Sequence, residues 1–288
     1  MQSVRQSRLV RRIAYAIERP GMTAALDVDP GILREVKSAN RAFLASVPQW
    51  IEDSDYQNSI FNYGLAASVR DYLNDPMTDE TTYSDLISTL AKCAGSSLRY
   101  LELGVSVGKN FAQVMHSAHG AQLTGFDIEN VNPTLEKMLT KVGSVEWATM
   151  EGSKRKTSST LTSYTHAANS NQVRYLAGDI FDDNSWERLR GGSFNMIFSD
   201  AFHSAEALLK EWEMIKKTDI LSRDGFVMLW DDLGSRAMRF AYYRIVEELR
   251  RAQKRGAVSA GIRMYRGWLG RRGPYHPLGF VKSAGIST

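Results

Sequence analysis

Apolar residues recur at helical spacing throughout the first 95 residues of this 288-residue chain. The first such helix ends at Pro20-Gly21, because proline and glycine interrupt the pattern there. Further segments near 31–46, 56–74 and 79–93 repeat apolar positions every three or four residues. No stretch of this part has the alternation of a strand, so the pattern predicts an N-terminal region made only of helices.

After residue 97 the pattern changes to short apolar runs that alternate with helical stretches. Such alternation is typical of a parallel sheet whose two faces are covered by helices. The predicted strands are 98–103, 121–128, 172–178, 193–200 and 225–230, and the predicted helices are 108–118, 133–142, 184–190 and 204–217.

The C-terminal part predicts a long helix followed by two strands. Met238, Ala241, Ile245 and Leu249 share one helical stripe. The strands, 257–266 and 276–283, are joined by a short basic loop, which suits an antiparallel hairpin at the edge of the sheet.

One segment, residues 151–171, is rich in Ser, Thr, Lys and Asn. Because it has few large apolar residues to offset the entropy of ordering, we interpret it as a long mobile loop that orders over a bound ligand.

Composition places the chain among ordinary globular proteins, with 43% apolar and 24% charged residues. No apolar run approaches the roughly 18 residues of a membrane-spanning helix, and no secretory signal is apparent. The single cysteine, Cys93, excludes an intrachain disulfide and a cysteine-based zinc site. We therefore expect a cytoplasmic protein without a membrane partner.

Charge is unevenly distributed along the chain. The net charge of +4 comes from basic ends, since residues 1–19 carry five arginines and one glutamate, and residues 234–288 carry twelve basic and two acidic residues. Basic ends are compatible with nucleic-acid binding, but much of the C-terminal charge lies on an ordinary amphipathic helix.

Two glycines, Gly104 and Gly108, lie between the first predicted strand and the helix after it. In an open α/β sheet, ligands bind at this turn, where glycines permit close approach of the backbone. The motif is ExGxxxG, starting at Glu102, and Ser106 stands where a dinucleotide fingerprint requires glycine. The motif therefore argues against an NAD-type enzyme.

Acidic residues follow the second and third predicted strands. Asp127 lies 23 residues after Gly104, where a carboxylate can accept hydrogen bonds from both hydroxyls of a ribose. Asp179 follows the third strand, and its alternative role is to cap the next helix.

The motifs ELGVSVGKN, FDI and AGDIF resemble the cofactor site of class I S-adenosylmethionine (SAM)-dependent methyltransferases, over about residues 95–285. In that family the glycine loop packs beside the methionine part of SAM. The acid after the second strand holds the ribose, and the acid after the third strand lies near the adenine amino group. The resemblance assigns these roles to Glu102, Gly104, Ser106 and Gly108, to Asp127, and to Asp179 with Ile180.

Three carboxylates follow the fourth and fifth strands: Asp200 and the pair Asp231-Asp232. Converging oxygen ligands at this edge predict a Mg²⁺ site that activates a hydroxyl for methylation. The arrangement resembles the catechol O-methyltransferase branch and its bacterial natural-product relatives, although the catechol enzymes usually carry Asp-Asn at the pair. The alternative for the pair is N-capping of the helix at Ser235.

His203 follows Asp200 in an Asp-x-x-His-Ser pattern that resembles bacterial small-molecule relatives. With Asp200, it is the candidate catalytic residue, because an imidazole can take a proton at neutral pH. Its alternative is to cap the following helix. His276 is close to the expected rim of the site, whereas His116, His119 and His166 are expected on the surface.

The resemblance implies an α/β fold, a Rossmann-like doubly wound and mostly parallel sheet with a C-terminal antiparallel hairpin and an N-terminal helical extension. We expect residues 1–95 to form a lid or support a dimer, and residues 96–288 to form the methyltransferase domain with an insertion at 130–171. Aromatic residues of the added segments are candidates for an acceptor pocket or for the core: Trp50, Tyr56, Tyr63 and Trp147.

The expected reaction is SAM-dependent methyl transfer to a hydroxyl or amine of a small molecule, assisted by metal. Nucleic acid is not expected as the acceptor, because no NPPY-like tetrapeptide follows the fourth strand. The alternatives are a metal-independent methyltransferase with His203 as base and a non-catalytic basic module that binds nucleic acid.

Overall fold

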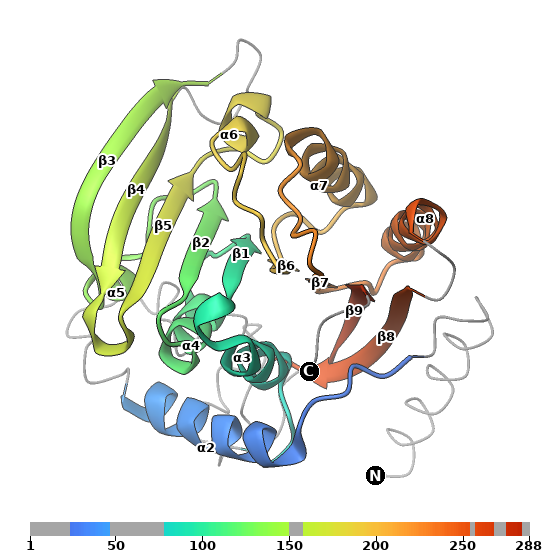
Figure 1. The fold of residues 1–288 in the computed structure, drawn as a ribbon, viewed down its shortest axis with the longest axis horizontal. Helices are drawn as coiled ribbons and strands as arrows, with labels where there is room; N and C mark the ends of the chain where they lie inside the picture. The colour runs from blue at the N-terminus through green and yellow to red at the C-terminus, as the bar shows by residue number, and fades with distance from the viewer. Residues whose placement is uncertain (1–23, 47–77, 150–157, 254–256, 268–274, 284–288) are drawn as a thin grey trace, which may run out of the picture.

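A nine-stranded sheet organises the protein (Figure 1). The computed structural model describes residues 24–46, 78–149, 158–253, 257–267 and 275–283. Within these residues the strands lie in the order β3-β4-β5-β2-β1-β6-β7-β9-β8.

Five central strands are parallel, as the alternation of strands and helices predicts. Counted along the chain, these five follow the 3-2-1-4-5 order of the first strands of a doubly wound Rossmann sheet. The winding reverses at β1, whose neighbours are β2 and β6, so the ligand crevice is expected at its carboxyl end. The five are β1 (Arg99–Leu103), β2 (Gln122–Asp127), β5 (Asn171–Ala177), β6 (Met196–Ser199) and β7 (Val227–Trp230).

Helices cover both faces of the sheet (Figure 1). They bury two apolar clusters against it. Side chains of β1 alternate between them: Tyr100 belongs to one cluster, Leu101 and Leu103 to the other. One face carries α2 (Pro30–Ser46), α3 (Tyr83–Ala94), α4 (Lys109–Ser117) and α5 (Pro133–Glu136), with the short 3-10 turns η4 (Gly95–Ser97) and η5 (Ala167–Asn169) nearby. The other face carries α6 (Asp183–Glu187), α7 (Ala205–Thr218) and α8 (Arg236–Ala252).

Short polar side chains fix where the helices around the crevice begin. Thr82 and Asp85 form a reciprocal capping box at the start of α3. Ser204 accepts the Ala207 N–H at the start of α7, and Ser235 accepts the Met238 N–H at the start of α8, both at 3.1 Å.

The predicted C-terminal hairpin is confirmed. The strands β8 (Val258–Arg266) and β9 (Tyr275–Ser283) are antiparallel, and β9 also pairs antiparallel with β7, opposing Trp230 with Gly279. The hairpin thereby extends the sheet and brings the start of β9 beside the end of β7.

The insertion differs from the prediction. The helix expected over 133–142 ends at Glu136, and β3 (Thr140–Ala148) begins four residues later. The mobile loop expected over 151–171 is wrong for its described part, because β4 (Ser158–His166) pairs with both β3 and β5. The β-branched and aromatic residues of these polar segments favour strands once a neighbouring edge is available.

The described part of the N-terminal region packs on the sheet through α2 and α3. Phe43 and Leu44 of α2 share an apolar cluster with Leu86 and Ile87 of α3 and with Tyr100 of β1. The expected helices before Pro20 and over 56–74 lie outside the described residues. Among the helices that the structure describes, none combines the length and the apolar character needed to cross a membrane.

Candidate functional site

A cleft with two connected halves lies at the carboxyl ends of the parallel strands. One half has a volume of about 270 Å³ and the other about 210 Å³. Gly104, Ser106, Asp200 and Ala201 line both halves. The crevice therefore opens where the winding of the sheet reverses, and the glycine loop divides it.

The glycine loop needs both of its glycines. Gly104 and Gly108 have φ values of +81° and +84°, in the region that favours glycine. A Cβ atom on Gly104 would stand 2.4 Å from the carbonyl oxygen of Asp200, and one on Gly108 would stand 2.8 Å from Leu135 Cδ2. The loop can therefore pass this close to its neighbours only without side chains.

Asp127, at the end of β2, is tied to the glycine loop. Its Oδ2 accepts the Ser106 N–H at 2.7 Å, and its Oδ1 accepts the Glu129 N–H at 2.8 Å. Ser106 is held at φ +50° by this loop. Because a carboxylate has about four acceptor positions, Asp127 still has acceptor capacity toward the smaller half of the cleft, which it lines.

The smaller half combines apolar side chains with three further carboxylates, Glu129, Asp179 and Asp200. Phe126, Ile128, Ile180 and Phe202 line it, and Phe202 is 48% exposed. Asp179 accepts the Phe181 N–H at 2.9 Å. The N-cap of α6 is Asp182, so helix capping does not explain Asp179.

Glu102 lies in the larger half, in a buried hydrogen-bonded group. Its Oε2 accepts the Tyr100 hydroxyl at 2.6 Å and the Asn110 amide at 2.8 Å. Burial raises the pKa of Glu102 to about 8, against the opposing effect of these two donors. The Oδ1 atom of Asn110 is buried and has no hydrogen-bond partner among the described residues.

Lys109 places an ammonium group in the same half of the cleft. Its Nζ donates to the Gly267 carbonyl at 3.2 Å, and burial lowers its pKa to about 7. Together with Glu102 and Asn110, it gives this half one cationic donor and two acceptors within a few residues of the glycine loop.

The acids after β6 and β7 form an alternating chain with two histidines. His203 Nε2 lies 2.9 Å from Asp200 Oδ1, and its Nδ1 lies 3.1 Å from Asp232 Oδ2. His276 Nδ1 lies 3.0 Å from Asp231 Oδ2 and 3.0 Å from Asp232 Oδ1. All five side chains line the larger half.

Charge coupling in this chain favours protonated imidazoles. Contacts with Asp200 and Asp232 raise the pKa of His203 to about 10, and those with His203 and His276 lower the pKa of Asp232. Burial alone would lower the pKa of His276, but the two aspartates raise it to about 10. Loss of solvent raises the pKa of Asp200 to about 7, although His203 opposes this.

Of the three predicted metal ligands, the structure brings Asp231 and Asp232 together with His276 and not with Asp200. Asp231, Asp232 and His276 bring one ligand atom each within 4.8 Å of the others. Asp200 lies in the same half of the cleft but reaches Asp232 through His203. Capping does not explain these residues, since Ser204 and Ser235 cap the helices that follow.

Sequence reasoning undervalued His276 and missed Lys109, Asn110 and Tyr83. Lys109 and Asn110 could have been found, because they follow Gly108 directly in the first turn of the helix. Tyr83 gives no such signal; it comes from α3, and its ring centroid lies 5.7 Å from that of His276.

Several other predicted positions lie away from the cleft. Trp147 packs under Arg188, whose Cζ lies 4.7 Å from the indole centroid. His116 and His119 are exposed as expected, but His166 is buried on β4, so its surface assignment is wrong. Trp50, Tyr56 and Tyr63 lie outside the described residues.

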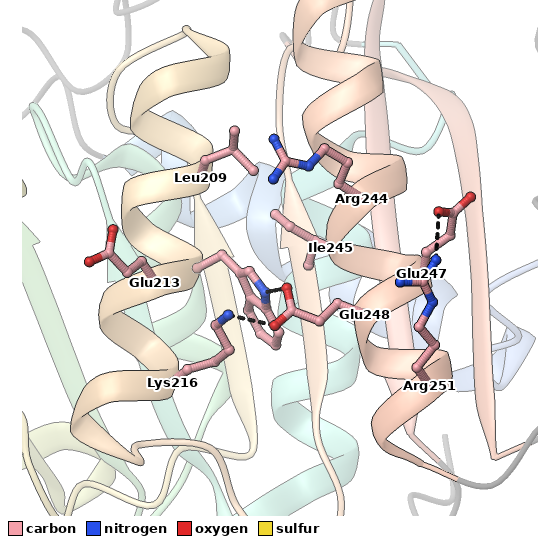
Figure 2. Close-up of a pocket in the computed structure, with 9 residues that line it drawn as sticks. Leu209, Glu213, Lys216, Arg244, Ile245, Glu247, Glu248 and Arg251 are labelled. Carbon is pink, nitrogen blue, oxygen red and sulfur yellow. Dashed lines mark hydrogen bonds and ion pairs between the residues drawn. The ribbon is translucent and has the colours of Figure 1, made fainter.

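A separate groove of about 510 Å³ lies between α7 and α8 and shares no residue with the cleft (Figure 2). Oppositely charged side chains meet across it: Lys216 lies 2.5 Å from Glu248, which also accepts the Trp212 indole N–H at 2.8 Å. We assign this groove to helix packing, because its polar groups neutralise one another.

No protein-family model and no curated protein matches the chain. Among solved structures, it is similar to an O-methyltransferase from Bacillus cereus in complex with SAH (15% identity, 90% of this chain, 93% of that chain, TM-score 0.44). It is also similar to the O-methyltransferase TomG from Streptomyces achromogenes, involved in tomaymycin synthesis, in complex with SAM (16% identity, 90% of this chain, 93% of that chain, TM-score 0.43). A third similar structure is a putative caffeoyl-CoA O-methyltransferase from Staphylococcus aureus (15% identity, 85% of this chain, 100% of that chain, TM-score 0.37). With TM-scores this low, function has to be argued from the side chains of the cleft.

Proposed function

We propose that this protein is a SAM-dependent methyltransferase that acts on a hydroxyl or amine group of a small molecule. The observation that carries the proposal is the division of one cleft into a half suited to a nucleoside and a half suited to an amino acid. A nucleoside joined through a sulfonium sulfur to an amino acid is the composition of SAM, and the glycine loop lies where the two parts join.

The smaller half suits adenosine. The carboxylate of Asp127 supplies acceptors for the ribose hydroxyls, and apolar side chains such as Ile128 and Ile180 offer a surface for the base. Asp179, which also lines this half, provides a carboxylate for an adenine amino group.

The larger half suits a zwitterionic amino acid. Glu102 and the unpartnered Oδ1 of Asn110 are acceptors for an α-ammonium group, and Lys109 is a donor for an α-carboxylate. The acids that line this half would repel a pyrophosphate, which disfavours a dinucleotide there.

Methyl transfer requires an acceptor atom that attacks the methyl carbon while the carbon–sulfur bond breaks and the acceptor loses a proton. We propose the Asp200–His203 pair for this proton transfer, because Asp200 lines both halves and His203 lies 2.9 Å from it. Both nitrogens of His203 contact carboxylates, which favour its protonated form, so we assign proton acceptance to the Asp200 carboxylate and the positioning of that carboxylate to His203.

The residues also fit a divalent cation, which we propose assists the reaction. Asp231 and His276 carry buried polar atoms without hydrogen-bond partners among the described residues, next to Asp232. When bound, such a cation lowers the pKa of a substrate hydroxyl and orients it. Asp200 would then accept a proton that leaves the substrate more readily.

Calorimetry with S-adenosylhomocysteine (SAH) tests the proposal. SAH should bind one to one, and 5′-methylthioadenosine, which lacks the amino-acid part, should bind more weakly. NAD⁺ and a random RNA serve as competitors for the alternative functions. Failure to bind SAH, together with salt-dependent binding of RNA, would indicate a basic nucleic-acid-binding module instead.

A further inference from the structure

We propose that Asp231, Asp232 and His276 bind a divalent transition-metal ion, such as Co²⁺ or Zn²⁺, in preference to Mg²⁺. The inference rests on the proposed function only for what the metal would do in catalysis. Binding itself follows from the geometry and chemistry of the three side chains, and it can be measured without cofactor or acceptor.

The spacing of the ligand atoms suits a common metal. His276 Nδ1 lies 3.0 Å from one oxygen of Asp231 and 3.0 Å from one oxygen of Asp232. Ligands at about 2.1 Å from a metal stand about 3.0 Å apart when they occupy adjacent octahedral positions, and about 3.4 Å apart in a tetrahedron. The observed separations therefore fit adjacent positions around one ion.

These separations also fall in the range of hydrogen bonds and of the ion pairs that a protonated His276 makes in the absence of metal, so a metal ion at Nδ1 would displace that proton. Nδ1 of His276 is buried and has no hydrogen-bond partner among the described residues, although both oxygens are near. Asp231 is 3% exposed, and its Oδ1 is also buried without a partner there. Buried polar atoms are rarely left so, and an ion that they coordinate would satisfy them.

The backbone holds the three ligands in place. Asp231 and Asp232 follow β7, and His276 lies on β9, which pairs directly with β7. The Leu233 N–H donates to the Pro277 carbonyl at 3.1 Å, which ties the turn after β7 to the residue after His276. Asp232 has φ +54°, an uncommon conformation for a residue with a side chain.

A neighbouring histidine orients one ligand. His203 Nδ1 lies 3.1 Å from Oδ2 of Asp232, while the other oxygen, Oδ1, faces His276. Such outer contacts fix a carboxylate and are typical of metal sites. All three ligands line the larger half of the cleft, so a metal there would be open to an acceptor oxygen or to water.

The imidazole decides the class of metal. Mg²⁺ prefers an all-oxygen shell and keeps most of its waters, whereas Zn²⁺, Co²⁺, Ni²⁺ and Fe²⁺ bind nitrogen well. A set of two carboxylates and one imidazole therefore favours a transition metal over Mg²⁺, in contrast to the all-oxygen ligand set expected from sequence.

The test is a metal titration of the full chain after EDTA treatment and dialysis, without SAM. Co²⁺ should bind one to one and produce visible ligand-field absorption, and calorimetry should give an affinity for Co²⁺ at least about 100-fold above that for Mg²⁺. Co²⁺ affinity no greater than that for Mg²⁺, or no binding of Co²⁺, would overturn the proposal.

Variants locate the site. His276→Asn should weaken Co²⁺ binding by about 100-fold or more while changing Mg²⁺ binding little, because an amide oxygen replaces the nitrogen. Asp231→Asn should weaken both metals. His119→Asn is the control, since it removes an exposed imidazole outside the cleft and should leave Co²⁺ binding unchanged. Unchanged Co²⁺ binding in His276→Asn would overturn the site.

Two further measurements separate this inference from the proposed function. Thermal unfolding in EDTA verifies that each variant is folded, and SAH calorimetry in EDTA tests the cofactor site alone. Loss of SAH binding with intact Co²⁺ binding would reject the methyltransferase and retain the metal site. SAH binding without Co²⁺ binding would retain the methyltransferase proposal and reject the metal site.

Discussion

Gly104 and Ala201 meet backbone to backbone at the centre of the cleft: a Cβ atom on Gly104 would stand 2.4 Å from the Cα atom of Ala201. The glycine loop after β1 therefore lies directly against the turn after β6. This approach brings Asp200 beside the loop. The residues proposed for cofactor binding therefore lie next to those proposed for proton transfer.

Gly104→Ala should both destabilise the protein and abolish SAH binding. The added methyl group clashes with backbone atoms, which cannot rotate away, and the φ of +81° is strained for alanine. We expect a loss of about 3 to 5 kcal/mol in the free energy of unfolding, measured with urea.

Gly191→Ala is the matched control for Gly104→Ala. Its φ is +79°, but nothing lies within 4 Å of an added Cβ. It should lose only about 1 to 2 kcal/mol and keep SAH binding. Equal losses in the two variants would show that the close approach to Ala201 is unimportant.

Asp127→Asn should weaken SAH binding by about 10- to 100-fold, because charge-assisted hydrogen bonds to the ribose become neutral ones worth about half as much. Glu129→Gln, in the same half of the cleft, should change it much less. The measurement is calorimetry of both variants with SAH. Equal affinity of Asp127→Asn and the unmodified protein would contradict the ribose assignment.

The sequence predicts the parallel core and the residues at its carboxyl edge, because both can be recognised from short stretches of neighbouring residues. Each parallel strand is a short apolar run, and each candidate residue follows one directly, as Asp127 follows β2. Parallel strands end at one edge, so linear order suffices to bring Gly104, Asp127 and Asp200 to one cleft.

Two features that sequence did not predict, the contact of His276 with Asp231 and the strand at 158–166, depend on pairing between distant segments. His276 reaches Asp231 only because β9 inserts between β7 and β8, 45 residues further along the chain. The strand at 158–166 is polar, and its pairing with β3 and β5 rather than its own apolar pattern makes it a strand. Neither relationship can be read from local periodicity.

Asp85→Ala should detach the described N-terminal helix α2 from α3. The Asp85 carboxylate is fully buried and accepts from Asn40 Nδ2 at 3.0 Å, from Arg41 at 3.2 Å and from the Thr82 N–H at 2.9 Å. Removing it leaves the partly buried Arg41 without this partner, at a cost of about 3 to 5 kcal/mol. Urea unfolding measures the loss.

Asp79→Ala is the control for Asp85→Ala, since the Asp79 side chain is exposed. It should stay within about 0.5 kcal/mol of the unmodified protein. A comparable loss in both variants would argue that the Asp85 contacts do not hold α2.

Proton exchange on SAH binding should reveal the amino-acid half of the cleft. In the free protein the pKa of Glu102 is raised to about 8, so at pH 7 this carboxyl is mostly neutral. A bound α-ammonium favours the carboxylate, so Glu102 should release a proton, and its contribution to affinity should increase from pH 6 to pH 8. Tyr100 and Asn110 donate hydrogen bonds to the same carboxyl group, whereas burial and the nearby charges of Asp200 and Asp127 raise its pKa.

Lys109 should exchange a proton in the opposite direction. Its pKa is lowered to about 7, so about half of the lysines are neutral at pH 7, and a bound α-carboxylate favours the ammonium form. Glu102→Gln should therefore leave net proton uptake, and Lys109→Met should leave net release. Calorimetry at pH 7 in phosphate and in Tris, which differ in ionisation enthalpy, measures both. If neither variant changes the number of protons exchanged, SAH does not place its amino-acid part between these two residues.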